Sequence, residues 1–410
     1  MTVDNISAIT GYDPFDLETR KYPYDHYAWL RENSPAYYVA EHDFWILSRH
    51  EHVAWGVNAT DVLSSAEGIA VERVVDLSAL GMEGAENLSE VMISKDPPDH
   101  RRLRDLVQKE FTPRRIAGWE AKVRDITEAC VHDLMEHNKS GNADLTEHLA
   151  TPLPVTVIAE ILGIPTADRK KFKDWSEDIV YLIGGGIDPA LQMTALGSAM
   201  ELATYFDAIV NERRAQPGED LISVLLGSTK DGDSLAHHEV IAQCMLFLIG
   251  GNETTTNLIG NTLHALVQHP DQLRRCVEDP SLIEWAIEET LRWDAPVQGL
   301  FRTSRSPFEI DGTEIPNDAR VQLLYGSANR DERQYHNAAN FDLDRRSRNH
   351  FAFGGGPHYC IGAPLARLET RIAMEYLLPR IRNIEIRDEP QMNYNVLVRG
   401  FRSLPIAFDA

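Results

Sequence analysis

The stretch FAFGGGPHYCIG, residues 351–362, places a single cysteine, Cys360, behind three glycines, a proline and a histidine. Glycine lets the backbone adopt positive φ angles and approach another group closely, at an entropic cost. A free cysteine is most often a small buried hydrophobic residue. The glycines predict that something flat or bulky lies against this loop, but on this stretch alone a simple buried cysteine remains the more common case, and the rest of the chain must decide.

A second candidate is LIGGNETTTN, residues 248–257, inside a long helical pattern. Gly250 and Gly251 each destabilise a helix by about 1 kcal/mol relative to alanine. The hydroxyl of Thr254 is placed to bond back to the carbonyl of Gly250 and bend the helix. Two interpretations stay open. One is close helix packing with a solvated acid, and the other is an opened helix in which Glu253 and Thr254 relay protons.

Charged residues at helical spacing form a third candidate group. In EETLR (288–292), Glu289 and Arg292 are three residues apart and share a helix face, and Arg345 is a candidate third member. An exposed pair of this kind contributes little to stability, whereas a buried pair needs further partners.

A fourth group consists of basic donors. His100 and Arg104 lie one helical turn apart, Arg302 follows the helix expected at 281–292, and His358 lies two residues before the cysteine. Each alone is most simply a surface residue. Together they offer four donors that can hold two carboxylates, and arginine suits bidentate pairing.

The composition limits the class of protein. The 410 residues carry 40 Lys and Arg against 63 Asp and Glu, a formal charge of -23 at pH 7. This balance disfavours nucleic acid or an anionic membrane as the main partner. None of the four cysteines forms a CxxC pair, no signal peptide is visible at the N-terminus, and no apolar run reaches the ~20 residues that span a bilayer. We expect a cytoplasmic monomer that binds neither nucleic acid nor membrane.

The hydrophobic periods predict mostly helix, with strands near both ends of the chain. We expect one domain over 1–410, mainly α with small β-sheets (α+β). Its β-rich lobe is expected from about 35–65 and 300–326 plus 385–408. A hairpin is expected at 308–315, with Asp311 and Gly312 in the turn. Helices are expected at 100–111, 114–137, 154–162, 167–183, 190–215, 237–269 and 281–292, the last with a Ser281–Glu284 capping box.

In this order and spacing, FGGGPHYCIG (353–362), GGNETT (250–255) and EETLR resemble the cytochrome P450 family of haem-thiolate monooxygenases. DPPDHRRLR (96–104) and RGFRSLPI (399–406) are similar to its soluble bacterial members, and the resemblance covers about residues 13–408. The chain departs little from the family pattern: Pro357 and Glu253 replace more usual residues.

The resemblance implies the P450 fold, with haem b between the long distal helix and the cysteine loop. It also implies roles for the candidate residues. Cys360 is the expected thiolate ligand of the iron, which favours O–O cleavage, and Glu253 and Thr254 are the expected proton relay to dioxygen. Haem-binding residues are expected at His100, Arg104, Arg302, Phe353, Gly354, His358 and Gly362. A structural network is expected from Glu289, Arg292 and Arg345.

By the same resemblance, the reaction inserts one atom of O2 into an apolar small organic substrate, by hydroxylation or epoxidation. A lid is expected at 64–95 and the opposite wall at 181–188. Expected pocket residues are Ile69, Val71, Val91, Met92, Leu246, Ile249, Gly250, Val297, Leu300 and Val398.

The chain shows no flavin or iron–sulfur motif, so electrons from NAD(P)H are expected to arrive through a reductase and a separate acidic ferredoxin or flavodoxin. A basic docking face on the cysteine side would steer such a partner. Its expected members are Arg101, Arg102, Lys109, Arg114, Arg115, Arg345, Arg346 and Arg348.

Two other functions compete with this interpretation. A haem-thiolate sensor or carrier without turnover would have no need of the Glu253–Thr254 pair. A phosphate cradle in a nucleotide enzyme is disfavoured, because neither glycine cluster follows a clear strand or precedes GK[ST].

Overall fold

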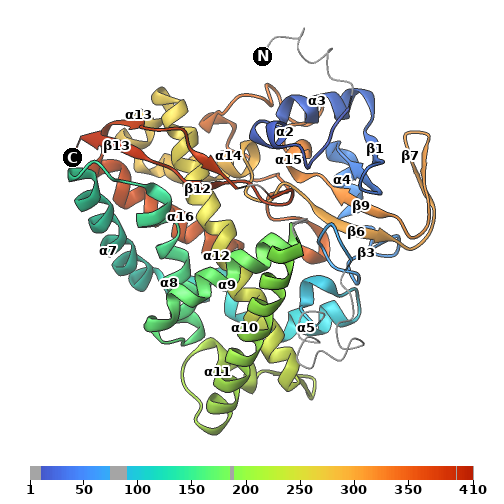
Figure 1. Cartoon of the computed structure of the whole chain (residues 1–410), viewed down its shortest axis with the longest axis horizontal. Helices are drawn as coiled ribbons and strands as arrows, with labels where there is room; N and C mark the ends of the chain where they lie inside the picture. Colours follow the sequence, from blue (N-terminus) through green and yellow to red (C-terminus); the bar gives the residue numbers. More distant parts are fainter. Residues whose placement is uncertain (1–10, 74–89, 185–188, 394, 410) are drawn as a thin grey trace.

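The chain arranges a small group of strands beside a larger group of helices (Figure 1). The computed structural model describes residues 11–73, 90–184, 189–393 and 395–409. A large hydrophobic core lies among the helices, and smaller cores flank the main sheet. The predicted fold class, mainly α with small β-sheets, is confirmed.

Helices make up most of the described chain. The α-helices are α2 (Leu17–Lys21), α3 (Tyr24–Asn33), α4 (His50–Gly56), α5 (Asp99–Val107), α6 (Pro113–Ala117), α7 (Glu120–Lys139), α8 (Pro152–Leu162), α9 (Arg169–Ile183), α10 (Pro189–Ala215), α11 (Leu221–Gly227), α12 (His237–Gln268), α13 (Pro270–Glu278), α14 (Ile283–Trp293), α15 (Tyr325–Ala328) and α16 (Ala363–Leu377).

The long helix α12 organises this group. It runs for 32 residues and packs against α8, α9, α10, α14 and α16. In Figure 1 it crosses the middle of the helices in yellow. At its start, the Glu239 carboxylate accepts a hydrogen bond of 2.8 Å from the backbone N–H of Ala236, which satisfies one otherwise unpaired amide. The predicted helix at 237–269 is therefore confirmed.

The main sheet has five strands in the order β1-β2-β9-β6-β3. Strands β2 and β9 are parallel, and the other neighbours are antiparallel. The sheet thus joins two distant stretches of the chain, as predicted for 35–65 and 300–326. The bounds are β1 (Ala36–Val39), β2 (Phe44–Leu47), β3 (Leu63–Ser64), β6 (Leu300–Ser304) and β9 (Arg320–Leu323).

The remaining strands form two-stranded sheets. The hairpin of β7 (Phe308–Ile310) and β8 (Thr313–Ile315) has positive φ at Asp311 (49°) and Gly312 (79°), which the turn of such a hairpin requires. The other pairs are β4 (Thr229–Lys230) with β5 (Asp233–Ser234), β10 (Arg382–Ile386) with β13 (Ile406–Asp409), and β11 (Gln391–Met392) with β12 (Phe401–Ser403).

The C-terminal strands differ from the expected β-rich lobe. Strands β10 to β13 pair among themselves and pack on α7 and α12, outside the five-stranded sheet. An isolated bridge between Val297 and Val398 links this region to the residues before β6.

Two helix predictions are wrong in detail. The helix expected at 114–137 is divided, since α6 ends at Ala117 and α7 begins at Glu120. The Ser281–Glu284 capping box does not form. Instead the Asp279 carboxylate accepts a 3.0 Å hydrogen bond from the backbone N–H of Ser281, and Glu284 pairs with Arg348.

Candidate active site

The cysteine loop runs from Phe353 into the start of α16. The backbone N–H of Cys360 donates to the carbonyl of Phe353 at 2.9 Å and closes the loop. Gly356 has φ of 59°, and a Cβ there would lie 2.3 Å from the backbone carbonyl oxygen of Val57, at the end of α4. This glycine is therefore required by packing against another part of the protein, which the sequence pattern alone did not indicate.

The sulfur of Cys360 lies at the N-terminal end of α16. Burial raises the pKa of its thiol, while the backbone N–H groups of Gly362 and Ala363 and the Arg104 guanidinium act in the opposite direction. A helix N-terminus and nearby arginines favour a thiolate. The N–H groups of Gly362 and Ala363 and the charge of Arg104 would therefore stabilise the thiolate form of Cys360.

The four basic donors expected near the loop come together. The rings of His100 and His358 have centroids 4.1 Å apart, and His358 Nε2 lies 3.2 Å from the hydroxyl oxygen of Ser65. Burial lowers the pKa of His358 to about 2, and the charges of Arg302, His100 and Arg104 add to this effect.

The positive charge of this cluster belongs to Arg104 and Arg302, because burial and the neighbouring arginines lower the pKa of both His100 and His358. Arg302 is 3% exposed, and its Nη1 donates to the carbonyl of Phe301 at 2.7 Å. In the part of the chain that the structure describes, neither Arg302 nor Arg104 forms an ion pair with a carboxylate. Burying an unpaired guanidinium is costly, so this cluster has the chemistry of a site for an anionic ligand.

One face of α12 is open, although the helix is otherwise largely buried. Leu246, Ile249 and Thr254 are half-buried and Gly250 is exposed, at the spacing of a single helix face. A Cβ at Gly250 would meet nothing within 4 Å, whereas one at Gly251 would touch Ile158. The two glycines therefore differ: the first opens onto free space and the second serves packing.

The Thr254 hydroxyl donates to the carbonyl of Gly250 at 2.8 Å, as predicted. The neighbouring Glu253 carboxylate accepts a hydrogen bond of 2.7 Å from Asn393 Nδ2, which also lies 3.2 Å from Asn257 Oδ1. Burial raises the pKa of Glu253, the charge of Glu177 adds to this, and the two amides act in the opposite direction.

Asn393 was missed by the sequence reasoning. It directly follows β11, 140 residues after Glu253, and no local pattern connects the two positions. It also lines a small pocket together with Tyr27, Gln298 and Arg399. The volume of this pocket, about 20 Å³, suits a single water molecule. Asn393 therefore connects Glu253 with a polar pocket.

The predicted charge network is assembled in a buried position. Arg292 is fully enclosed and binds Glu289 through two hydrogen bonds, of 2.9 and 2.7 Å. Its Nη1 also donates to the carbonyls of Asn329 and Ala338. Arg345 Nε donates to the same carboxylate at 3.1 Å. Each charged group of this network has several partners, as a buried ion pair requires.

A second buried acid, Glu288, was also missed. It is 1% exposed and accepts hydrogen bonds from His350 Nε2 at 3.1 Å and from Arg367 at 2.5 and 3.0 Å. Burial alone would raise the pKa of Glu288, but these hydrogen bonds outweigh it and hold the pKa below its ordinary value. The Arg367 guanidinium lies 4.6 Å from the ring centre of Phe353, so this pair contacts the cysteine loop directly.

The residues expected in the substrate pocket lie in different parts of the fold. Val71 is buried in a core with Phe44 and Phe301, and Leu300 and Val398 are half-buried against the same core. Met92 is buried in the large helical core instead. Val91 and Val297 are half-buried, and the Ile69 carbonyl accepts from the N–H of Phe301 at 3.0 Å. Positions 74–89 of the expected lid and 185–188 of the expected wall lie outside the described residues.

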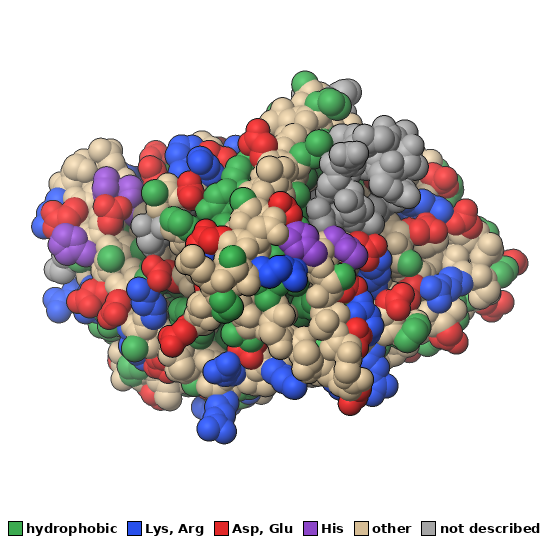
Figure 2. Space-filling view, turned by 90° about the horizontal axis from the view of Figure 1, so that it is seen from below, with side chains coloured by type: hydrophobic (Ala, Val, Ile, Leu, Met, Phe, Trp, Pro, Cys, Tyr) green, Lys and Arg blue, Asp and Glu red, His purple; other side chains and the backbone are tan. Residues whose placement is uncertain are grey.

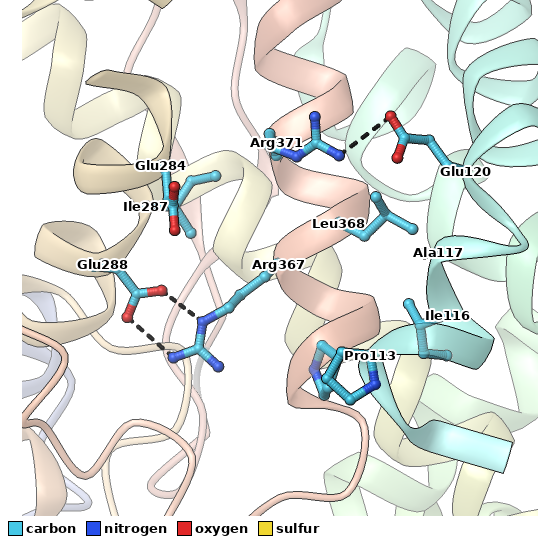
Figure 3. Close-up of a pocket in the computed structure, with 11 residues that line it drawn as sticks. Pro113, Ile116, Ala117, Glu120, Glu284, Ile287, Glu288, Arg367, Leu368 and Arg371 are labelled. Atoms are coloured by element: carbon cyan, nitrogen blue, oxygen red, sulfur yellow. Dashed lines mark hydrogen bonds and ion pairs between the residues drawn. The ribbon is translucent and has the colours of Figure 1, made fainter. Parts of the chain in front are cut away.

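A groove lies on the cysteine side of the molecule, between α6 and α7, α14 and α16 (Figure 3). Its volume is about 280 Å³. Figure 3 shows Ile116 and Leu368 beside two ion pairs, Arg371 with Glu120 and Arg367 with Glu288. An apolar floor between charged walls suits contact with another protein.

Two residues of the predicted docking face form several contacts within the fold. Arg345 is held by Glu289 and three backbone carbonyls, and Arg102 pairs with Asp233 and Glu239 near the start of α12. The Arg345 side chain is 11% exposed and that of Arg102 is 36% exposed, and the docking face stays a prediction.

The other predicted members of the face are exposed. Arg114 and Lys109 form no ion pair among the residues that the structure covers. The rest already have neighbours, namely Arg101 with Asp105, Arg115 with Glu110, Arg348 with Glu284, and Arg346 over the Trp285 ring. On the face seen in Figure 2, acidic and basic side chains are interspersed rather than separated by sign.

The comparisons with known proteins agree with this geometry. The family model described as Cytochrome P450 matches residues 43–399. The chain is 37% identical over 392 residues to the cytochrome P450 monooxygenase PikC of Streptomyces venezuelae, covering 94% of this chain and 90% of that protein. The chain therefore belongs to the cytochrome P450 family, and it is an oxidoreductase of the class that incorporates oxygen.

Solved structures give the same result. P450BioI in complex with an acyl carrier protein ligated to hexadec-9Z-enoic acid matches with a TM-score of 0.88 at 30% identity, covering 96% of this chain and 99% of that chain. CYP109E1 from Bacillus megaterium in complex with testosterone matches with a TM-score of 0.86 at 33% identity, with the same coverage of each chain. Among the described helices, none is long and apolar enough to cross a membrane.

Proposed function

We propose that this protein binds haem b through Cys360 and inserts one atom of O2 into a largely apolar small organic substrate, while the other atom leaves as water. The observation that supports this most strongly is the cluster of His100, Arg104, Arg302 and His358, in which neither guanidinium charge is balanced by an ion pair with a carboxylate among the described residues. Haem carries two carboxylates that would supply this balance, and it provides the oxygen chemistry when bound.

The residues present fit this cofactor. Cys360 would ligate the iron, and the N–H groups of Gly362 and Ala363 would temper the charge on sulfur. Phe353 and Gly354 would lie alongside the ring, with Phe353 held from behind by Arg367. The role of the two buried acids, Glu288 and Glu289, is to fix the loop that presents the sulfur.

The open face of α12 would form the wall of the site opposite the cysteine loop. Gly250 leaves room for a small molecule beside the helix. The Thr254 hydroxyl would donate a proton there, and Glu253 would replace it. Because burial raises the pKa of Glu253, this acid holds its proton more tightly than an exposed carboxyl group and is better suited to donate it near neutral pH.

Asn393 is the positioning residue of this relay. Its amide holds one carboxylate oxygen of Glu253 at 2.7 Å and thereby fixes the side chain. The pocket that Asn393 lines would supply water, so that protons reach Glu253 from the protein surface.

The substrate is expected to be apolar because the side chains around the open face are. Leu246 and Ile249 on this face are half-buried and offer aliphatic surface. Two structural neighbours are described with a fatty acid on a carrier protein and with testosterone. Both ligands are mainly hydrocarbon, which agrees with a site that binds through buried apolar area.

Electrons would arrive at the groove on the cysteine side. An acidic ferredoxin or flavodoxin, reduced by NAD(P)H through its own reductase, would dock over Ile116 and Leu368 with Arg114 at the edge. Charge complementarity would accelerate this encounter even though the protein as a whole carries -23.

The test is turnover of the holoprotein with ferredoxin, reductase, NADPH and isotopically labelled dioxygen, on a panel of apolar compounds chosen by their effect on the haem spin state. We expect a product that contains one labelled oxygen atom. A product whose new oxygen comes from water, or NADPH oxidation with no product for any strongly bound compound, would contradict the proposal.

A further inference from the structure

Two histidines and an aspartate meet on the helical side of the molecule, apart from the residues discussed so far. Asp133 and His137 lie one turn apart near the end of α7, and His148 belongs to the short π-helical turn Thr146–Ala150 that follows. His148 Nδ1 is 2.9 Å from Asp133 Oδ2, and His137 Nδ1 is 3.5 Å from Asp133 Oδ1. The two imidazole rings stack with centroids 3.8 Å apart.

We propose that Asp133, His137 and His148 form a binding site for a divalent transition-metal ion, of which Zn²⁺ fits best. One ligand atom from each residue lies within 4.8 Å of the other two. Zinc binds imidazole nitrogen and carboxylate oxygen at about 2.0–2.2 Å in a tetrahedral arrangement, so its ligand atoms lie about 3.3 Å apart. The present separations are 2.9 Å from His148 Nδ1 to Oδ2 and 3.5 Å from His137 Nδ1 to Oδ1 of Asp133, which are different carboxylate oxygens. Because the two rings are also nearly parallel, binding would require the exposed side chains of Asp133 and His137 to rotate toward the ion.

The ligand types select the class of ion. Two imidazoles and one carboxylate suit zinc and its neighbours in the transition series, whereas Mg²⁺ and Ca²⁺ prefer oxygen ligands. Three protein ligands leave a fourth position for water. The site would therefore bind an ion reversibly rather than enclose it.

The three side chains differ in how exposed they are to solvent. The side chain of His148 is 8% exposed, while those of Asp133 and His137 are 53% and 43% exposed. The buried histidine provides a fixed ligand, and the exposed residues let an ion arrive from solvent. His137 Nδ1 also lies 2.9 Å from the backbone carbonyl of Asp133, so binding exchanges this contact or uses the other ring nitrogen.

The ion would tie two parts of the fold together. The segment between α7 and the π-helical turn is attached to the C-terminal strands, since Asn138 Nδ2 donates to the carbonyl of Phe408 at 2.8 Å and the Asp144 carboxylate accepts from the N–H of Leu404 at 3.2 Å. A metal bridge from α7 to His148 would hold this segment in place. Its effect is expected on stability, because the site shares no residue with the proposed catalytic groups.

The experiment is calorimetric titration of ZnCl2 into holoprotein freed of metal ions by chelation and dialysis, at neutral pH. We expect one zinc site per chain that is lost in His148→Ala and in Asp133→Asn. We also expect it to be retained in His132→Ala, a control on the same helix whose side chain is 76% exposed and lies 4.0 Å from Glu136. Saturating zinc should raise the melting temperature of the wild type and the control by about 3 °C.

The same titration can overturn the proposal. Equal zinc stoichiometry and affinity in the wild type and His148→Ala would do so, as would an equal rise in melting temperature with MgCl2. If His148→Ala does not fold, His137→Gln replaces a more exposed ligand, and its unchanged haem spectrum would show an intact fold. Zinc binding that persists in His137→Gln would equally contradict the site. Binding is also expected to weaken in acid, because the imidazoles must be neutral.

Discussion

The charge network beside the cysteine loop and the polar residues of α12 differ in how many hydrogen-bond partners their buried groups have. On the cysteine side, Glu289 and Arg292 are buried and each has several hydrogen-bond partners, and Glu288 is held by His350 and Arg367. On the α12 side, Asn257 Nδ2 and Thr256 Oγ1 are buried and lack a partner among the described residues.

The acids show the same contrast. The pKa of Glu288 is held below its ordinary value, whereas the pKa of Glu253 is raised. An acid with a lowered pKa stabilises the fold in its charged form, and one with a raised pKa is destabilising in that form. Glu369 on α16 is an exception, because it is buried, its Oε2 lacks a partner among the described residues, and burial raises its pKa. The charge network of Glu288, Glu289 and Arg292 therefore stabilises the fold, whereas ionising Glu253 costs folding free energy and suits proton transfer.

The largest effect on stability is expected from a substitution in the charge network beside the cysteine loop. Arg292→Met leaves Glu289 buried with fewer partners, and removing one member of a buried pair costs about 3–5 kcal/mol. We expect a large fall in the urea midpoint and in the yield of haem-loaded protein. Arg348→Gln removes an exposed pair with Glu284 and is the matched control, with an expected loss below about 1 kcal/mol. Equal midpoints for both variants would contradict the contrast.

On the α12 side, Thr254→Ala is expected to affect chemistry without affecting folding. Loss of the hydroxyl should lower product formed per NADPH by about tenfold or more, with electrons diverted to peroxide. Thr254→Ser keeps the hydroxyl and should retain most of the coupling. Asn393→Ala, which frees the Glu253 carboxylate, is expected to give a smaller loss and an altered pH profile. Fully coupled turnover in Thr254→Ala would refute the assignment.

Stability as a function of pH distinguishes the two acids. The folded-state pKa of Glu288 lies below its ordinary value of 4.5, so its contribution is present above that pH and is lost as pH falls through the folded value. Glu288→Gln should therefore melt lower than the wild type at pH 7, and the gap should narrow in acid.

The pKa of Glu253 is shifted in the opposite direction, so its charged form destabilises the fold. Ionising this group costs the folded state free energy, so Glu253→Gln should melt about 1–3 °C higher than the wild type near pH 7.5. This difference should shrink as pH falls through the folded pKa and vanish below the ordinary value of 4.5. Thermal melts of the wild type and both variants from about pH 3 to 8 would measure both differences. A destabilised Glu253→Gln at neutral pH would contradict the contrast.

The smallest effect is expected at the groove. Arg114→Glu reverses an exposed charge that has no ion pair among the described residues, whereas Arg115→Glu reverses one already paired with Glu110. Stopped-flow reduction by ferredoxin should slow several-fold in Arg114→Glu and lose salt dependence. Identical rates in the wild type and both variants would argue against docking at this edge.

The features that the sequence predicted are those encoded locally or by a family pattern. The bounds of α12, the hairpin at Asp311 and the meeting of Glu289 with Arg292 follow from spacing along one helix or one turn. The open face at Gly250 was an alternative that the residues themselves raised.

The features that the sequence missed depend on contacts between distant segments. Glu288 and Arg367 are 79 residues apart, and Glu253 and Asn393 are 140 apart. The ion pairs of Arg102 with Asp233 and Glu239 were missed for the same reason, because these acids lie on other elements. The sequence shows which residues are charged but not which of them will form ion pairs. The arginines of the docking face were therefore expected to be unpaired.

The most direct measurement of the central claim is the spectrum of the reduced protein with carbon monoxide, for the wild type, Cys360→Ser and Cys276→Ser. Cys276 is a buried free cysteine outside the loop and serves as the control. The account predicts the red-shifted band of thiolate-ligated haem in the wild type and in Cys276→Ser, and its loss in Cys360→Ser. Persistence of that band in Cys360→Ser would contradict the account.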